Sequence, residues 1–139
     1  MENFTVFISS DPQYPWYDDC YPDELGDEWN ENSERQITQQ YQFMNLLAKK
    51  YEQYKLFSVK GHIINGDLTA YGHRWQLNKY KKLVKLLKIP YYPGLGNHDY
   101  ENNVKDNTVT DGYSVNGIAP SNMINYMYDW LKDAMKNRQ

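Results

Sequence analysis

Apolar side chains recur along this chain with two periods, one typical of strands and one of helices. Short β-branched and aromatic runs lie at residues 4–8 and 60–65, and a weaker run, limited by two prolines, lies at residues 91–95. Each run ends at a polar, turn-forming stretch. Runs of this length bounded by turn residues predict three strands, each followed directly by a loop.

Apolar residues at helical spacing fill the intervals between these strands. Ser33 and Gln36 have the spacing of a capping box, which predicts a helix over residues 33–51. Further apolar faces predict helices over residues 73–88 and from Ser121 onward.

The segments between the predicted elements have no clear period. Residues 13–32 are rich in Tyr, Asp, Pro and Trp and are interpreted as an ordered excursion, and residues 100–120 are interpreted as turns. Next to the second predicted helix, His73 is expected to be an exposed capping residue. Trp75, at helical spacing, is expected to belong to the core.

The order of predicted elements is β, α, β, α, β, loop, α, which favours a parallel sheet with helices packed against it. In sheets of this kind, ligands gather at the carboxyl ends of the strands. A polar cluster follows each predicted strand, at residues 11–13, 66–67 and 97–99. We therefore expect three stretches that are distant in sequence to meet in space.

Composition narrows the function classes. The chain has 139 residues and is expected to form one domain, residues 1–139. Its net charge is -3, with the basic residues scattered, so it lacks the footprint of a protein that binds a nucleic-acid backbone. The single Cys20 excludes an internal disulfide and a thiolate metal cluster. No membrane span or signal peptide is recognisable, which predicts a soluble chain, cytoplasmic or secreted after loss of a leader.

The side chains of the three polar clusters suit metal-assisted chemistry. Carboxylates, amide oxygens and imidazole bind hard or borderline divalent cations. A carboxylate can bridge two cations, and Asp67 is suited to this role if it lies between Asp11 and Asn97. Two bridged divalent cations generate hydroxide from a bound water at neutral pH and neutralise charge on a phosphoryl oxygen. Gly66-Asp67 alone is more often an ordinary turn, so the combination carries the hypothesis.

The same clusters resemble the first three motif blocks of the calcineurin-like metallophosphoesterase family, which read Asp-X-His, Gly-Asp and Gly-Asn-His-Asp/Glu. The matching stretches are residues 11–13, 66–69 and 96–99, and the likeness extends over residues 4–100. It implies an α/β fold, namely the N-terminal half of a four-layer α/β/β/α sandwich with a mainly parallel sheet flanked by helices. It also implies hydrolysis of phosphomonoesters or phosphodiesters by a metal-bound hydroxide.

The resemblance implies ligands for two divalent cations, manganese, iron or zinc. Asp11 and Gln13 would ligate the first cation, and Asp67 would bridge both. Asn97 would ligate the second through its side-chain oxygen. Gln13 replaces the histidine of the family pattern, which shifts the preference away from cations that favour nitrogen.

The resemblance also implies residues that act on the substrate. His98 would contact the phosphoryl group and protonate the leaving oxygen, with Asp99 orienting its imidazole. Asn97 and His98 would contact the substrate, and Tyr14, which follows the first block, is a further candidate contact.

The later motif blocks of the family, a lone histidine and a Gly-His-X-His, are absent, since His62, His73 and His98 are the only histidines. We therefore expect an N-terminal portion of the phosphoesterase domain that binds two cations, one or none. The alternative is a catalytically silent binding module, or a subunit completed by a second chain, with an exposed sheet face and edge that favour self-association. An unrelated nucleotide-binding domain is disfavoured, because no glycine-rich phosphate loop opens a helix.

Overall fold

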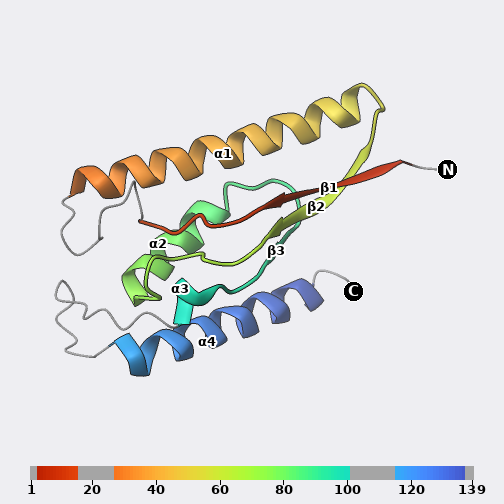
Figure 1. The fold of residues 1–139 in the computed structure, drawn as a ribbon. Coiled ribbons are helices and arrows are strands. Elements are labelled where there is room, and N and C mark those ends of the chain that lie inside the picture. Colours follow the sequence, from red (N-terminus) through yellow and green to blue (C-terminus); the bar gives the residue numbers. More distant parts are fainter. Residues whose placement is uncertain (1–2, 16–26, 101–114, 137–139) are drawn as a thin grey trace.

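A three-stranded parallel sheet forms the centre of the computed structural model (Figure 1). The described residues are 3–15, 27–100 and 115–136. The strands are β1 (Phe4–Ser9), β2 (Ser58–Ile64) and β3 (Tyr91–Pro93), and they lie side by side in chain order. The α/β class and the parallel sheet expected from the sequence are therefore confirmed.

Two helices cross over between the strands, and two more follow the sheet. They are α1 (Asp27–Gln53), α2 (Arg74–Val84), α3 (Asn97–Tyr100) and α4 (Val115–Lys136). The turn expected at residues 97–99 is thus the short helix α3. The parts of the expected excursion and turns at residues 16–26 and 101–114 lie outside the described residues.

Two helix starts were predicted wrongly. Helix α1 begins at Asp27, and Ser33 is a buried residue inside it rather than its cap, because no glycine or proline between these positions stops the helix. Helix α4 begins at Val115 and contains Pro120. Pro120 is the sixth residue of this helix, so it removes an N–H that would otherwise bond to the carbonyl of residue 116.

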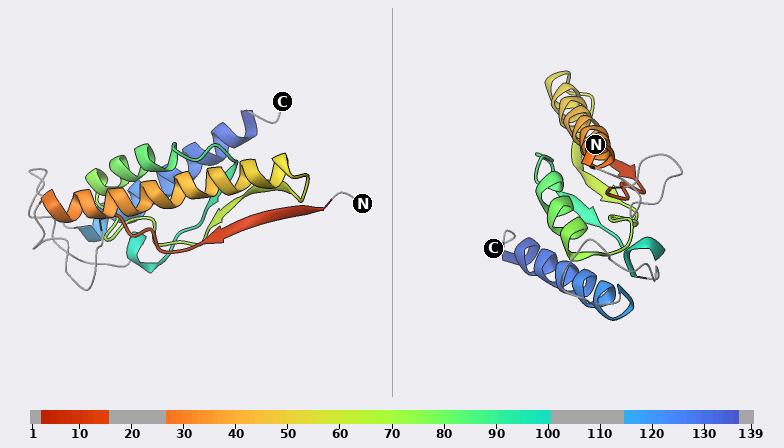
Figure 2. Two further views of the ribbon diagram at one scale, coloured as in Figure 1. Left: turned by 90° about the horizontal axis from the view of Figure 1, so that it is seen from above. Right: turned by 90° about the vertical axis from the view of Figure 1, so that its left-hand side faces the viewer.

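Helices α1, α2 and α4 all lie on one side of the sheet, which leaves the sheet with a covered and an open face (Figure 2). The core fills the covered side. There, the hydroxyl groups of Tyr41 on α1 and Tyr80 on α2 lie 3.2 Å apart and join the two helices. The core cluster consists of Tyr14, Ile37, Tyr41, Ile64, Leu68, Leu77, Tyr80, Leu83, Val84, Leu87, Met123 and Tyr126.

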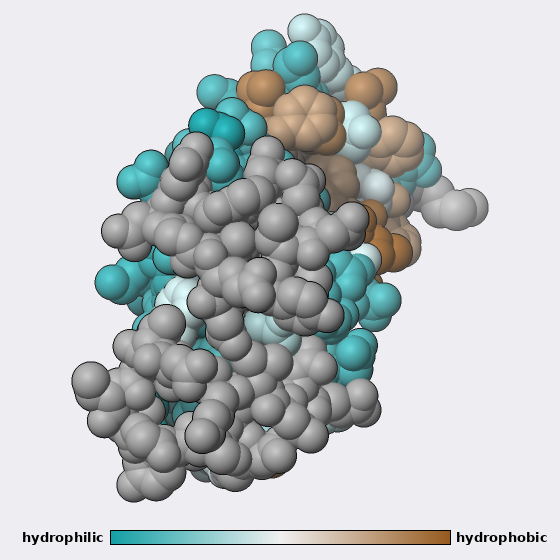
Figure 3. Space-filling view, turned by 60° about the vertical axis from the view of Figure 1, so that its left-hand side comes forward, coloured by the Kyte–Doolittle hydropathy of each residue, from teal (hydrophilic) through white to brown (hydrophobic). Residues whose placement is uncertain are grey.

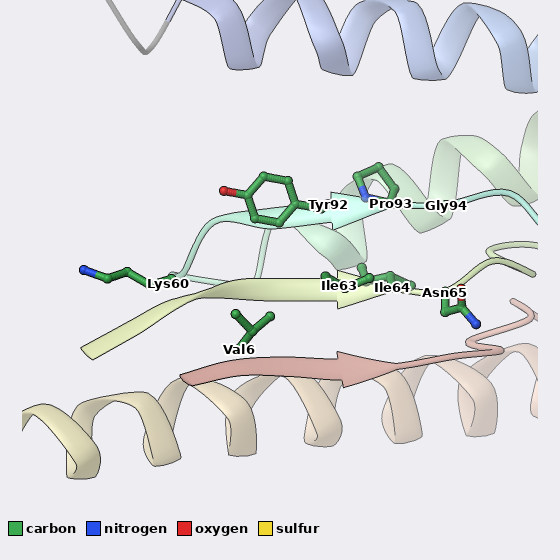
Figure 4. A pocket seen from close by; sticks show the side chains of 8 residues that line it. All are labelled: Val6, Lys60, Ile63, Ile64, Asn65, Tyr92, Pro93 and Gly94. Carbon is green, nitrogen blue, oxygen red and sulfur yellow. The ribbon is translucent and has the colours of Figure 1, made fainter. Parts of the chain in front are cut away.

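The open face of the sheet carries apolar side chains. Ile8 of β1 is 71% exposed and pairs with Ile63 of β2, which in turn pairs with Tyr92 of β3. Figure 4 shows Ile63, Tyr92 and Val6 lining a pocket of about 440 Å³ across the strands, with α2 behind the sheet and α1 and α4 along its two sides. Apolar surface also gathers in one area of the space-filling view (Figure 3). The row of Ile8, Ile63 and Tyr92 across the open face is suited to packing against another layer of polypeptide.

None of the helices within residues 27–100 and 115–136 combines the length with the apolar character needed to cross a bilayer.

Buried His62 makes the stability of the fold depend on pH. Its ring is fully buried on β2, the Nε2 atom lies 2.7 Å from the Ser9 hydroxyl, and Nδ1 has no partner. Burial lowers the pKa of His62 below its usual value of 6.5. Below that pH the unfolded chain takes up a proton that the folded chain excludes, so the free energy of unfolding falls as the pH falls.

We expect the His62→Gln variant to lose this component of the pH dependence. Urea unfolding between pH 5 and 7, which brackets the usual pKa of about 6.5, should show a flatter profile than the wild type. The matched Ser9→Ala variant removes the hydrogen bond and keeps the imidazole, so it should lower stability at every pH without flattening the profile. An equal slope in wild type and His62→Gln would contradict the assignment.

Candidate functional site

The loops that follow β1 and β2 run side by side beyond the strand ends. The Asp11 amide donates to the Gly66 carbonyl at 3.2 Å, and the Gln13 amide donates to the Asp67 carbonyl at 2.8 Å. In Figure 1 the three strand arrows point the same way, and α3 lies beyond their tips. The His98 amide on α3 donates to Oδ1 of Asp67 at 3.0 Å. The three motif blocks therefore meet at one edge of the sheet.

Asp67 lies at the centre of this meeting point. Its carboxyl group is hydrogen-bonded to that of Asp11 and also accepts the His98 amide. Burial raises the pKa of Asp67, as do the bond with Asp11 and the negative charge of Asp99, whereas the bond with the His98 amide lowers it. Two carboxylates this close repel each other, and a divalent cation beside them stabilises both charges, so the arrangement suits such a cation.

The backbone is strained at the same positions. Asp11, Gln13 and Asp67 have φ angles of 55°, 37° and 50°, in the left-handed region that costs most residues about 1 kcal/mol or more. The other non-glycine residue with positive φ among those described is Lys55, in the turn after α1. Strain of this kind concentrates at functional sites, where side-chain placement outweighs backbone preference.

Two glycines allow the second and third blocks to touch. A Cβ on Gly96 would collide with the Asp67 carboxyl group and come within 2.6 Å of the Asp67 amide nitrogen. Gly66 has a φ of 81°, and a Cβ there would lie 2.8 Å from the Gly96 nitrogen. These positions admit only glycine, because backbone packs directly against backbone and against the central carboxylate.

Asp99 does not have the surroundings expected of a residue that orients an imidazole. It is fully buried, and its Oδ2 accepts the amides of Leu68 and Gly96. Its Oδ1 accepts the amide and hydroxyl of Thr69, both at 2.9 Å. Burial raises the pKa of Asp99, and these bonds oppose the rise. The carboxylate therefore joins the second and third loops from within the core.

The imidazole of His98 is held by the backbone. Its Nδ1 lies 3.0 Å from the carbonyl oxygen of Ala70. A carbonyl oxygen only accepts, so Nδ1 carries the hydrogen, and the neutral ring has its lone pair on Nε2. The ring is half-buried, while the neighbouring Asn97, which begins α3, is exposed.

Two residues near the motif blocks were placed wrongly from the sequence. Tyr14 was expected to contact substrate, but it is 3% exposed, packs edge-on against Trp75 and donates its hydroxyl to Glu34 at 3.4 Å. Its chain segment pairs with Thr69, which turns the ring into the core. His73 was expected to be an exposed capping residue: it does cap α2, but it is buried, with its ring stacked on Trp75. Trp75, which was expected in the core, is partly buried and packs against the core cluster.

The donors at this edge suit an oxygen-preferring cation. The described part of the chain has no group of three or more His, Cys, Asp or Glu residues arranged to hold a metal. Asp11 and Asp67 bring two carboxylates together. Amide side chains are carried by Gln13, whose backbone amide binds the Asp67 carbonyl, and by Asn97, which precedes His98 in the chain. An all-oxygen set of this kind favours hard cations such as manganese over zinc.

Two supporting residues were not recognised in the sequence. Thr69 donates its hydroxyl to Asp99 and accepts the Gly72 amide at 2.9 Å, and Gln76 accepts the amides of Tyr71 and His73. The sequence did indicate a role for Gln76, because it follows the capping residue His73 by three positions, which is the spacing of a capping box.

No family model, no curated protein and no solved structure matches this chain.

Proposed function

We propose that this chain carries the first half of the active site of a calcineurin-like metallophosphoesterase that hydrolyses phosphomonoesters or phosphodiesters. The observation that carries the proposal is the contact between the carboxyl groups of Asp11 and Asp67 where two parallel strands end. The His98 amide on the same carboxylate adds the third motif block. Backbone strain at Asp11, Gln13 and Asp67 supports a functional role for these side chains.

The fold gives independent support to the larger architecture. One sheet covered on a single face by helices corresponds to two of the four layers of an α/β/β/α sandwich. Its open face presents Ile8, Ile63 and Tyr92, which are suited to packing against a second sheet.

Each residue has a separate task in the proposed reaction. Asp11 and Gln13 would hold one cation, Asn97 would hold another, and Asp67 would lie between them. Divalent cations supply an activated water and neutralise charge on the phosphoryl group. His98 would present Nε2 to the substrate, because Nδ1 is bound to the Ala70 carbonyl. With a proton on both ring nitrogens, it would donate the Nε2 proton to the leaving oxygen and return to the neutral Nδ1–H form.

Manganese binding and hydrolysis test this proposal directly. We expect calorimetry to detect manganese binding to the chain, and manganese to stimulate turnover of p-nitrophenyl phosphate or bis-p-nitrophenyl phosphate. A chelator should abolish the turnover. A chain that binds no manganese and hydrolyses neither substrate would contradict the proposal.

A second candidate function is a catalytically silent subunit that another chain completes. Two observations favour it: the apolar open face, and the lack of a group of three His, Cys, Asp or Glu ligands in the described residues. Light scattering separates the two candidates. Association with tighter manganese binding at high protein concentration supports the subunit, whereas a monomer with manganese-stimulated turnover excludes it.

A further inference from the structure

The loop between β2 and α2 presents the carbonyl that binds His98. Its conformation is fixed on one side by Thr69, which bonds to the Asp99 carboxylate and the Gly72 amide. Gly72 has a φ of 67°, and a Cβ there would lie 2.7 Å from Cβ of Ala119 on α4. The bonds of Thr69 and the close packing of Gly72 against α4 therefore restrict the conformation of the loop on both sides of Ala70.

On its other side, the loop is fixed by one side chain of α2. Oε1 of Gln76 accepts the Tyr71 amide at 2.9 Å and the His73 amide at 3.3 Å. Gln76 is fully buried, and its Nε2 has no partner. Both partners are N–H donors, so the oxygen must face them. Gln76 thus binds the loop through its side-chain oxygen alone, and its Nε2 group makes no bond to the loop.

We propose that Gln76 is a positioning residue for His98, an inference that rests on the proposed phosphoesterase function. Gln76 binds the Tyr71 amide, and the Ala70 carbonyl belongs to the same planar peptide, so its direction is fixed at the same time. The bond to the His73 amide holds the end of the loop. That carbonyl binds Nδ1 of His98 at 3.0 Å and sets the tautomer in which Nε2 meets the substrate. The Tyr71 ring, whose centroid lies 6.4 Å from that of His98, belongs to the same loop.

A pair of substitutions separates this role from simple packing. Gln76→Met removes the acceptor and retains the approximate length of the side chain. Gln76→Glu retains an acceptor oxygen for both amides and replaces the amide nitrogen that has no partner. If the acceptor is what matters, Gln76→Glu behaves like the wild type and Gln76→Met does not. Gln39→Met, on the exposed surface of α1, is the matched control.

The first readout needs neither substrate nor metal. Nitrogen-15 NMR of the histidine rings, with the His98 signals assigned from a His98→Gln variant, should show a single Nδ1–H tautomer in wild type, Gln76→Glu and Gln39→Met. Gln76→Met should show a mixture of tautomers. An unchanged tautomer in Gln76→Met, or a mixture in Gln76→Glu, would overturn the proposal.

The second readout is kinetic. Gln76→Met should lower kcat by as much as about 100-fold, with KM and manganese affinity unchanged, because a misplaced catalytic group affects the chemical step. A change confined to KM or to manganese affinity would overturn the positioning role. The two readouts also separate the two proposals: a wild type that lacks turnover but shows the expected tautomers refutes the phosphoesterase function and retains the link between Gln76 and His98.

Discussion

Replacing Asp67 with asparagine is expected to lower manganese-stimulated kcat/KM by about 10²- to 10³-fold, the usual cost of removing one preorganised electrostatic contact. Asparagine keeps an oxygen for the His98 amide, so the third loop stays in place. It cannot supply the negative charge that faces Asp11, so the attraction for a cation is lost. Turnover of p-nitrophenyl phosphate and calorimetric titration with manganese measure the two effects.

The control for this variant is Asp129→Asn, which makes the same chemical change on the exposed surface of α4. It should leave turnover and manganese affinity at wild-type values. Urea unfolding should show that Asp67→Asn remains folded. Unchanged manganese affinity in a folded Asp67→Asn protein would show that the cation, if bound, is held elsewhere.

Asp99→Asn is expected to lower the free energy of unfolding by about 2–4 kcal/mol, since each buried donor left without an acceptor costs about 1–3 kcal/mol. Both oxygens of Asp99 accept bonds from N–H or O–H groups. Asparagine offers one oxygen, and its amide nitrogen meets donors on the other side. The loops that carry Thr69 and Gly96 should therefore separate. Urea denaturation monitored by circular dichroism measures the loss.

Asp129→Asn again serves as the control, with an expected change below about 0.5 kcal/mol, as is usual for surface substitutions. Asp99→Asn should also weaken manganese binding, because the Gly96 backbone packs against the Asp67 carboxyl group. Wild-type stability in Asp99→Asn would contradict the role of Asp99 in joining the loops.

The sheet could be predicted from local pattern because strand runs and their turn residues are encoded within a few positions. The start of α1 could not, since a helix continues past its apolar stripe wherever no breaker stops it. The start of α4 could not either, because a breaker lies inside this helix without ending it. Pro120 appeared to be a boundary and lies inside α4. The sequence pattern also could not show that helices cover only one face of the sheet.

The meeting of Asp11 and Asp67 could be predicted because parallel strands bring their carboxyl ends together. Their role as metal ligands stays a prediction. The supporting contacts depend on backbone atoms, which residue types do not reveal. Asp99 therefore appeared to be the partner of the His98 ring, although the Ala70 carbonyl binds that ring. Tyr14 follows the first motif block, yet pairing of its segment with Thr69 directs it inward.

The left-handed backbone at Asp11, Gln13 and Asp67 sets stability against activity at the same three positions. Glycine adopts this conformation with no steric penalty, so a protein selected only for thermal resistance would tend to acquire glycine at these sites. Each such replacement would remove a proposed oxygen ligand. Stabilising libraries built on this chain should therefore hold these three residues constant, because variants enriched by heat treatment would include those that have lost the proposed chemistry.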